Sequence, residues 1–105
     1  METIPAKELD WYVGRPGFLI IDLRTIEEYD WMHIRGALNV PDGEFGSLLE
    51  GHRGSVLILY CDRGSRSMSI ARSLETQGWK TKTVVGGIHA YRGGNMVRRS
   101  GAGSH

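Results

Sequence analysis

Two short stretches of the chain are almost continuously apolar, and they set the class of fold. Phe18–Asp22 reads FLIID and Val56–Tyr60 reads VLILY. A strand with one exposed face alternates apolar and polar residues, whereas a strand covered on both faces is apolar along its length. The two runs therefore predict central strands of a parallel sheet with helices on both faces.

Further segments extend this pattern along the chain. Strands are also expected at Thr81–Val85 and, more weakly, near Thr3–Ile4 and Ala37–Asn39. Helices are expected at Ala6–Val13, Ile26–Trp31, Glu44–Leu49 and Arg66–Gln77. Alternating strands and helices are typical of a three-layer α/β domain. We expect a central, mostly parallel five-stranded sheet.

The helix at Arg66–Gln77 has the clearest signal. Small and apolar residues recur at spacings of three and four and form one narrow face, made by Ser67, Ile70, Ala71 and Leu74. Gly78 follows the helix, where glycine commonly ends one. This face is expected to pack closely on the sheet.

The length of 105 residues, with 40% hydrophobic and 24% charged residues, is that of one globular domain. We expect the domain to span residues 1–95. The segment 96–105 ends in RRSGAGSH and has little to bury, so it is expected to form a flexible tail.

Charge and targeting signals give no sign of a nucleic-acid or membrane partner, and neither is expected. The 13 basic and 12 acidic residues nearly balance. The chain shows no apolar segment of about 20 residues and no signal-peptide pattern at its start. A single cysteine cannot form an internal disulfide and fits a reducing compartment. A cytoplasmic location is expected.

The single cysteine, Cys61, directly follows the second apolar strand and begins the loop CDRGSR. Ligands of parallel α/β sheets bind beyond the carboxyl ends of the strands. The loop enters a helix, whose first N–H groups, together with Arg63 and Arg66, are expected to favour the thiolate. Cys61 is the candidate nucleophile, although the loop alone fits a buried structural cysteine equally well.

Loop length separates two kinds of cysteine chemistry. Cysteine phosphatases use C-x5-R, in which the arginine holds the phosphoryl oxygens, but that position here is Ser67. Arg66 comes one residue earlier and gives C-x4-R. The shorter loop suits a single sulfur atom better than a phosphate group, which argues against a phosphatase.

Three segments, in this order, resemble the rhodanese family of single-domain sulfurtransferases over about residues 3–94. They are IIDLRTIEEYDWMHIRGALNVP (Ile20–Pro41), the loop CDRGSR, and VVGGIHAYRGG (Val84–Gly94). Two positions depart from the family pattern: Met32 replaces a usual glycine and Tyr91 a usual tryptophan. Both lie outside the loop.

The resemblance implies a rhodanese-like fold and persulfide chemistry without a cofactor or metal. Cys61 would take a sulfane sulfur from a small anionic donor, such as thiosulfate, or from a persulfide. It would pass the sulfur to a thiol, to cyanide or to a sulfur-acceptor protein. The implied substrate-binding residues are those of the loop and the start of the helix: Asp62, Arg63, Gly64, Ser65, Arg66 and Ser67.

Asp22 and Arg24 could form an acid–base site, but the favoured interpretation is a structural ion-pair network behind the active site. His33 is expected to bind backbone and to order a loop. Two other functions are weighed against sulfur transfer. The first is a non-catalytic interaction module with the same fold, and the less favoured second is a phosphatase or arsenate reductase.

Overall fold

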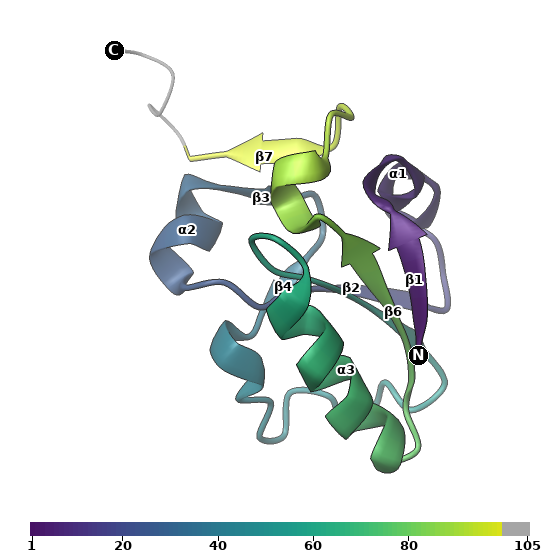
Figure 1. Ribbon diagram of the computed structural model, residues 1–105. Coiled ribbons are helices and arrows are strands. Elements are labelled where there is room, and N and C mark those ends of the chain that lie inside the picture. Colours follow the sequence, from purple (N-terminus) through teal and green to yellow (C-terminus); the bar gives the residue numbers. More distant parts are fainter. Residues whose placement is uncertain (100–105) are drawn as a thin grey trace.

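Five parallel strands form the centre of the protein in the computed structural model, which describes residues 1–99 (Figure 1). The strands are β1 (Glu2–Pro5), β2 (Phe18–Asp22), β4 (Leu38–Asn39), β5 (Val56–Tyr60) and β6 (Lys80–Val85). Their order across the sheet is β1-β6-β5-β2-β4. The expected five-stranded α/β architecture is confirmed, with the two apolar runs, β2 and β5, paired in the interior of the sheet.

Side chains of β5 alternate between two hydrophobic clusters, one on each face of the sheet. Leu57, Leu59 and Cys61 belong to the cluster beneath α3 (Ser65–Thr76). Ile58 and Tyr60 belong to the cluster on the opposite face. Because successive residues of a strand point to opposite faces, the nucleophile candidate and the tyrosine before it lie on opposite sides of the sheet.

The other helices are short. Residues of η1 (Ala6–Glu8), α1 (Leu9–Tyr12) and η3 (Gly87–Ala90) pack in the cluster opposite α3. The helix α2 (Ile26–Trp31) contributes Tyr29 to the edge of the same cluster. After β4 comes the single turn η2 (Pro41–Gly43). Figure 1 shows α3 along the sheet and η3 near the loop that enters α3.

The helix α3 packs and ends as its sequence predicts. Ser67, Ala71 and Leu74 are buried, and Ile70 is partly buried. Gly78 adopts φ 90°, its N–H donates to the carbonyl of Glu75, and the N–H of Trp79 donates to the carbonyl of Leu74. These two bonds satisfy helix-end carbonyls through a left-handed glycine, which closes α3 before β6.

The helix predicted at Glu44–Leu49 is wrong: the segment forms successive turns. Gly43, Gly46 and Gly51 have positive φ, which no right-handed helix contains. The structure also differs from the helix predicted at Ala6–Val13. The segment begins as the 3-10 helix η1, and the α-helix α1 that follows ends at Tyr12.

A second, two-stranded antiparallel sheet was not predicted. It pairs β3 (Met32–Ile34) with β7 (Met96–Arg98). The flexible tail expected from residue 96 is therefore corrected: the ordered domain continues through β7. Residues 100–105 lie outside the described part of the chain. Within residues 1–99, no helix has the length and apolar character needed to cross a membrane.

Candidate active site

Cys61 lies at the carboxyl end of β5 and is 4% exposed. Its Sγ atom accepts a hydrogen bond from the backbone N–H of Gly64 at 3.1 Å. Gly64 has φ 107° and immediately precedes α3, so the loop turns back over the sulfur before the helix starts. An N–H donor stabilises negative charge on sulfur more than it stabilises a neutral thiol.

The first turn of α3 completes the loop. No side chain caps the helix at Gly64, and the first N–H groups of a helix have no acceptor within it. Ser67 is buried, and its hydroxyl donates to the carbonyl of Gly64 at 2.9 Å. Ser67 therefore fixes the loop backbone, whereas Ser65 is exposed.

The segment Gly86–Ile88 supports the loop from the other side. The N–H of Ile88 donates to the carbonyl of Cys61 at 2.9 Å. A Cβ atom on Gly87 would overlap the carbonyl oxygens of Cys61 and Asp62. Gly87 is thus the residue that lets β6 and η3 approach the loop so closely, a role that the sequence did not reveal.

The two loop arginines have different surroundings. Arg63 is exposed, and no ion pair involves it in the part of the chain that the structure describes. Arg66 Nη1 donates to Asp42 Oδ1 at 2.9 Å, and this ion pair joins the start of α3 to η2. The positive charge of Arg66 is therefore shared with a carboxylate that sequence analysis did not single out.

Two acidic residues, Asp62 and Glu28, lie close enough to affect each other's protonation. Burial raises the pKa of Asp62, and the charge of Glu28 raises it further. Burial would also raise the pKa of Glu28, but hydrogen bonds with Thr25 at the start of α2 hold it below its usual value. Of the pair, Asp62 is the carboxyl group that protonates first as the pH falls.

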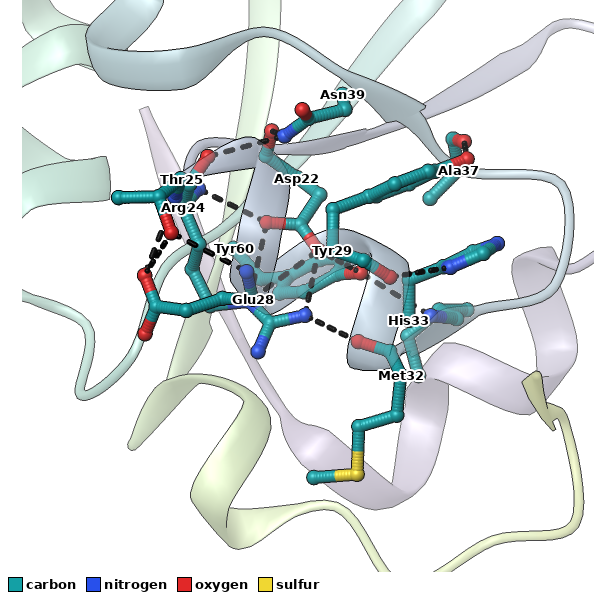
Figure 2. A network of polar contacts seen from close by, with 11 residues as sticks. Asp22, Arg24, Thr25, Glu28, Tyr29, Met32, His33, Ala37, Asn39 and Tyr60 are labelled. Atoms are coloured by element: carbon teal, nitrogen blue, oxygen red, sulfur yellow. Dashed lines mark hydrogen bonds and ion pairs between the residues drawn. The ribbon is translucent and has the colours of Figure 1, made fainter. Parts of the chain in front are cut away.

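Asp22 and Arg24 form a buried ion pair, as the sequence predicted (Figure 2). Arg24 Nη2 donates to Asp22 Oδ2 at 2.8 Å, and to the carbonyl of Met32 at 2.6 Å. Burial alone would lower the pKa of Arg24, but the hydrogen bond and charge of Asp22 raise it. The pair is buried away from solvent, with Asp22 fully buried, which fits a structural role.

Tyr60 completes this network, although the sequence reasoning passed over it. Its hydroxyl donates to Asp22 Oδ2 at 2.6 Å and accepts from the N–H of Ile34 at 3.1 Å. Asp22 and Tyr60 are register partners on β2 and β5, so their side chains share one face. The network therefore holds the residue directly before Cys61.

His33 orders backbone, as expected. Its Nδ1 lies 2.8 Å from the carbonyl of Tyr29, and its ring stacks on that of Tyr29 at 3.7 Å between centroids. Among residues 1–99 no group of three or more His, Cys, Asp or Glu side chains is placed to hold a metal ion.

The chain is similar to proteins that contain a rhodanese-like domain, and that family's model matches residues 5–93. It is 34% identical over 95 residues to tRNA sulfurtransferase of Desulfurococcus amylolyticus, covering 89% of this chain and 19% of the relative. It is 36% identical over 76 residues to YrkF, a candidate sulfur carrier protein of Bacillus subtilis, covering 70% and 41%.

A solved structure gives the same result for the fold. A rhodanese-like domain protein from Staphylococcus aureus superposes with a TM-score of 0.80 at 26% identity, covering 94% of this chain and 99% of the other. This chain spans less than half the length of the two sequence relatives. The names of these two relatives refer to sulfur transfer and to sulfur carriage. With a cysteine loop at the strand end and a family match over nearly its whole length, this chain belongs to the rhodanese-like domain family.

Proposed function

We propose that this protein is a sulfurtransferase that carries a sulfane sulfur on Cys61. The sulfur comes from thiosulfate or another small anionic donor, or from a persulfide, and goes to a thiol, cyanide or a sulfur-acceptor protein. The observation that carries the proposal is the hydrogen bond from Gly64 N–H to Cys61 Sγ, directly before the N-terminus of α3.

In the first step, the Cys61 thiolate attacks the outer sulfur of thiosulfate. A new S–S bond forms, the original S–S bond breaks, and sulfite leaves with the bonding electron pair. In the second step, the acceptor nucleophile attacks the terminal sulfur of the Cys61 persulfide. The Cys61 thiolate is then the leaving group, so no external oxidant or reductant is consumed.

The loop can stabilise negative charge both on the Cys61 thiolate and on the Cys61 persulfide. The N–H of Gly64 and the open N-terminal turn of α3 lie on the side where the persulfide anion would form. Arg63 and Arg66 are exposed at the loop and would meet an anionic donor first. The buried Asp22–Arg24–Tyr60 network would keep the end of β5 in place during both steps.

The test is the intact mass of the protein after incubation with thiosulfate and removal of the donor. We expect a gain of one sulfur atom that cyanide removes and that Cys61→Ser abolishes. If thiosulfate, polysulfide and mercaptopyruvate all leave the wild-type mass unchanged, sulfur transfer is excluded. The interaction module would then be the better proposal.

A further inference from the structure

Asp42 has an unusual backbone conformation beside the active-site loop. Among residues 1–99 it is the only non-glycine residue with positive φ, at 55°. Glycine adopts this region without steric cost, and among residues with a Cβ atom aspartate and asparagine enter it most readily. Asp42 thus occupies the left-handed position of the turn η2, and its side chain lies beside the start of α3.

The backbone on both sides of Asp42 is fixed by neighbouring elements. The N–H of Asp42 donates to the carbonyl of Leu23 at 3.1 Å, and that of Gly43 donates to the carbonyl of Val40 at 3.1 Å. Gly43 packs against Ile70 of α3, where an added Cβ would approach the Ile70 side chain to 3.1 Å. The turn η2 is therefore held between the sheet and α3, next to the first turn of that helix.

The Asp42 carboxylate meets the arginine that ends the six-residue loop. Its Oδ1 atom lies 2.9 Å from Arg66 Nη1, and both side chains are well exposed, at 69% and 53%. Such a pair is weak because water competes for both charges. A negatively charged donor can therefore replace Asp42 as the partner of Arg66. Otherwise the donor has to bind Arg66 while the Asp42 carboxylate is still beside it.

We propose that Asp42 is a specificity-determining residue, which competes with anionic sulfur donors for Arg66 and so selects against donors that carry two negative charges. This inference rests on the proposed sulfur-transfer function. The loop carries a further carboxylate, Asp62, and Glu28 lies close enough to it to raise its pKa. A donor with a single charge would be less affected, since Coulomb energy scales with the product of the charges.

The test compares two donors that differ mainly in charge: thiosulfate, a dianion, and methanethiosulfonate, a monoanion. With either donor, the Cys61 thiolate attacks the outer sulfur, the S–S bond of the donor breaks, and sulfite or methanesulfinate leaves with the bonding electron pair. The main variant is Asp42→Asn, because asparagine tolerates the left-handed region and keeps the size of the side chain. Asp42→Gly is a second variant, which removes the whole side chain while glycine keeps the left-handed backbone accessible. The matched control is Glu44→Gln, an exposed carboxylate two residues away.

We expect Asp42→Asn to lower the KM for thiosulfate about 3–5-fold at low salt, because no carboxylate then competes with the donor for Arg66. The KM for methanethiosulfonate should fall less than about 2-fold, and kcat should stay nearly constant for both donors. Salt near 0.5 M should remove most of the difference, since the Debye length is then about 4 Å. Glu44→Gln should behave like the wild type.

A double-mutant cycle with Arg66→Gln tests whether Asp42 acts through Arg66. The effect of Asp42→Asn should disappear in that background. An equal effect on both donors, a rise in the thiosulfate KM, or an unchanged KM would each overturn the inference, provided that the wild type is loaded with sulfur. If neither donor loads the wild type, the inference is overturned, whereas the proposed function still holds if polysulfide or mercaptopyruvate loads Cys61.

Discussion

The Tyr60 hydroxyl donates a 2.6 Å hydrogen bond to the fully buried carboxylate of Asp22. This bond ties the last residue of β5 to the last residue of β2, one position before Cys61. The same hydroxyl accepts from the N–H of Ile34, so one side chain joins two strands of the main sheet to β3. The position of the nucleophile candidate therefore depends on a hydrogen-bonded network on the opposite face of the sheet.

Tyr60→Phe is expected to lower the free energy of unfolding by about 1–3 kcal/mol, because it leaves the Asp22 carboxylate and the Ile34 N–H each without one partner. Urea denaturation measures the change. Tyr12→Phe is the matched control, since Tyr12 is also buried but has no hydroxyl partner in the described chain. Equal stability of the two variants would contradict the role given to the Tyr60 hydroxyl.

The comparison of the wild type with Tyr60→Phe also gives a prediction for the pH dependence of stability. Burial and the charge of Asp22 raise the pKa of Tyr60 well above its usual value. Folding thus favours the protonated phenol, and the stability that this contributes is complete below about pH 10 and is lost as the pH rises above it. The stability difference between wild type and Tyr60→Phe should therefore narrow above about pH 10.

Gly87→Ala is expected to damage both stability and sulfur loading. The added methyl group would overlap the carbonyl oxygens of Cys61 and Asp62, and φ at this position is 62°. We expect a loss of about 2 kcal/mol or more in unfolding free energy, together with slower persulfide formation. Gly94→Ala is the control, because no atom lies within 4 Å of its added Cβ. Wild-type loading by Gly87→Ala would show that the loop position is not set by this contact.

Glu75→Gln should change how the protein responds to acid. Glu75 Oε2 accepts from both the N–H and the hydroxyl of Thr81 at 2.8 Å, and these bonds lower the pKa of Glu75. A lowered folded-state pKa contributes stability above about pH 4.3, which is lost as the pH falls through the folded value. The wild type should be more stable at pH 7, and the difference should shrink in acid.

Thermal unfolding of both proteins between pH 7 and pH 3 measures this effect. Glu50→Gln is the control, because Glu50 is exposed and forms no ion pair among the described residues. A pH-independent difference between wild type and Glu75→Gln would mean that the carboxylate charge does not matter at the junction of α3 and β6.

Local patterns were sufficient for most of the sheet and for the nucleophile candidate. The apolar runs of β2 and β5 show burial on both faces, and Cys61 follows directly after one of them. The hydrophobic patterns of the buried strands and of the amphipathic helix each extend over enough residues to be recognised. The turns at Glu44–Leu49 were missed because a few residues of helical spacing carry less information than the glycines around them.

Contacts between distant segments were not predictable in the same way. The Asp42–Gly43 dipeptide is a turn signal, but nothing in it names Arg66, 24 residues later, as a partner. The alternation along β5 could have placed Tyr60 on the same face as Asp22, yet only the register of the two strands makes them neighbours. The three-residue strands β3 and β7 are too short for a periodic signal.

The sequence by itself determined the α/β class, the strand-end position of Cys61 and the six-residue loop, because these follow from residue order and local periodicity. Tertiary structure alone decided which side chains surround the loop. Gly87 lies against the carbonyls of Cys61 and Asp62, Glu28 lies near Asp62, and Asp42 pairs with Arg66. These contacts arise only when the sheet and helices pack, since packing brings together groups that are far apart in the chain.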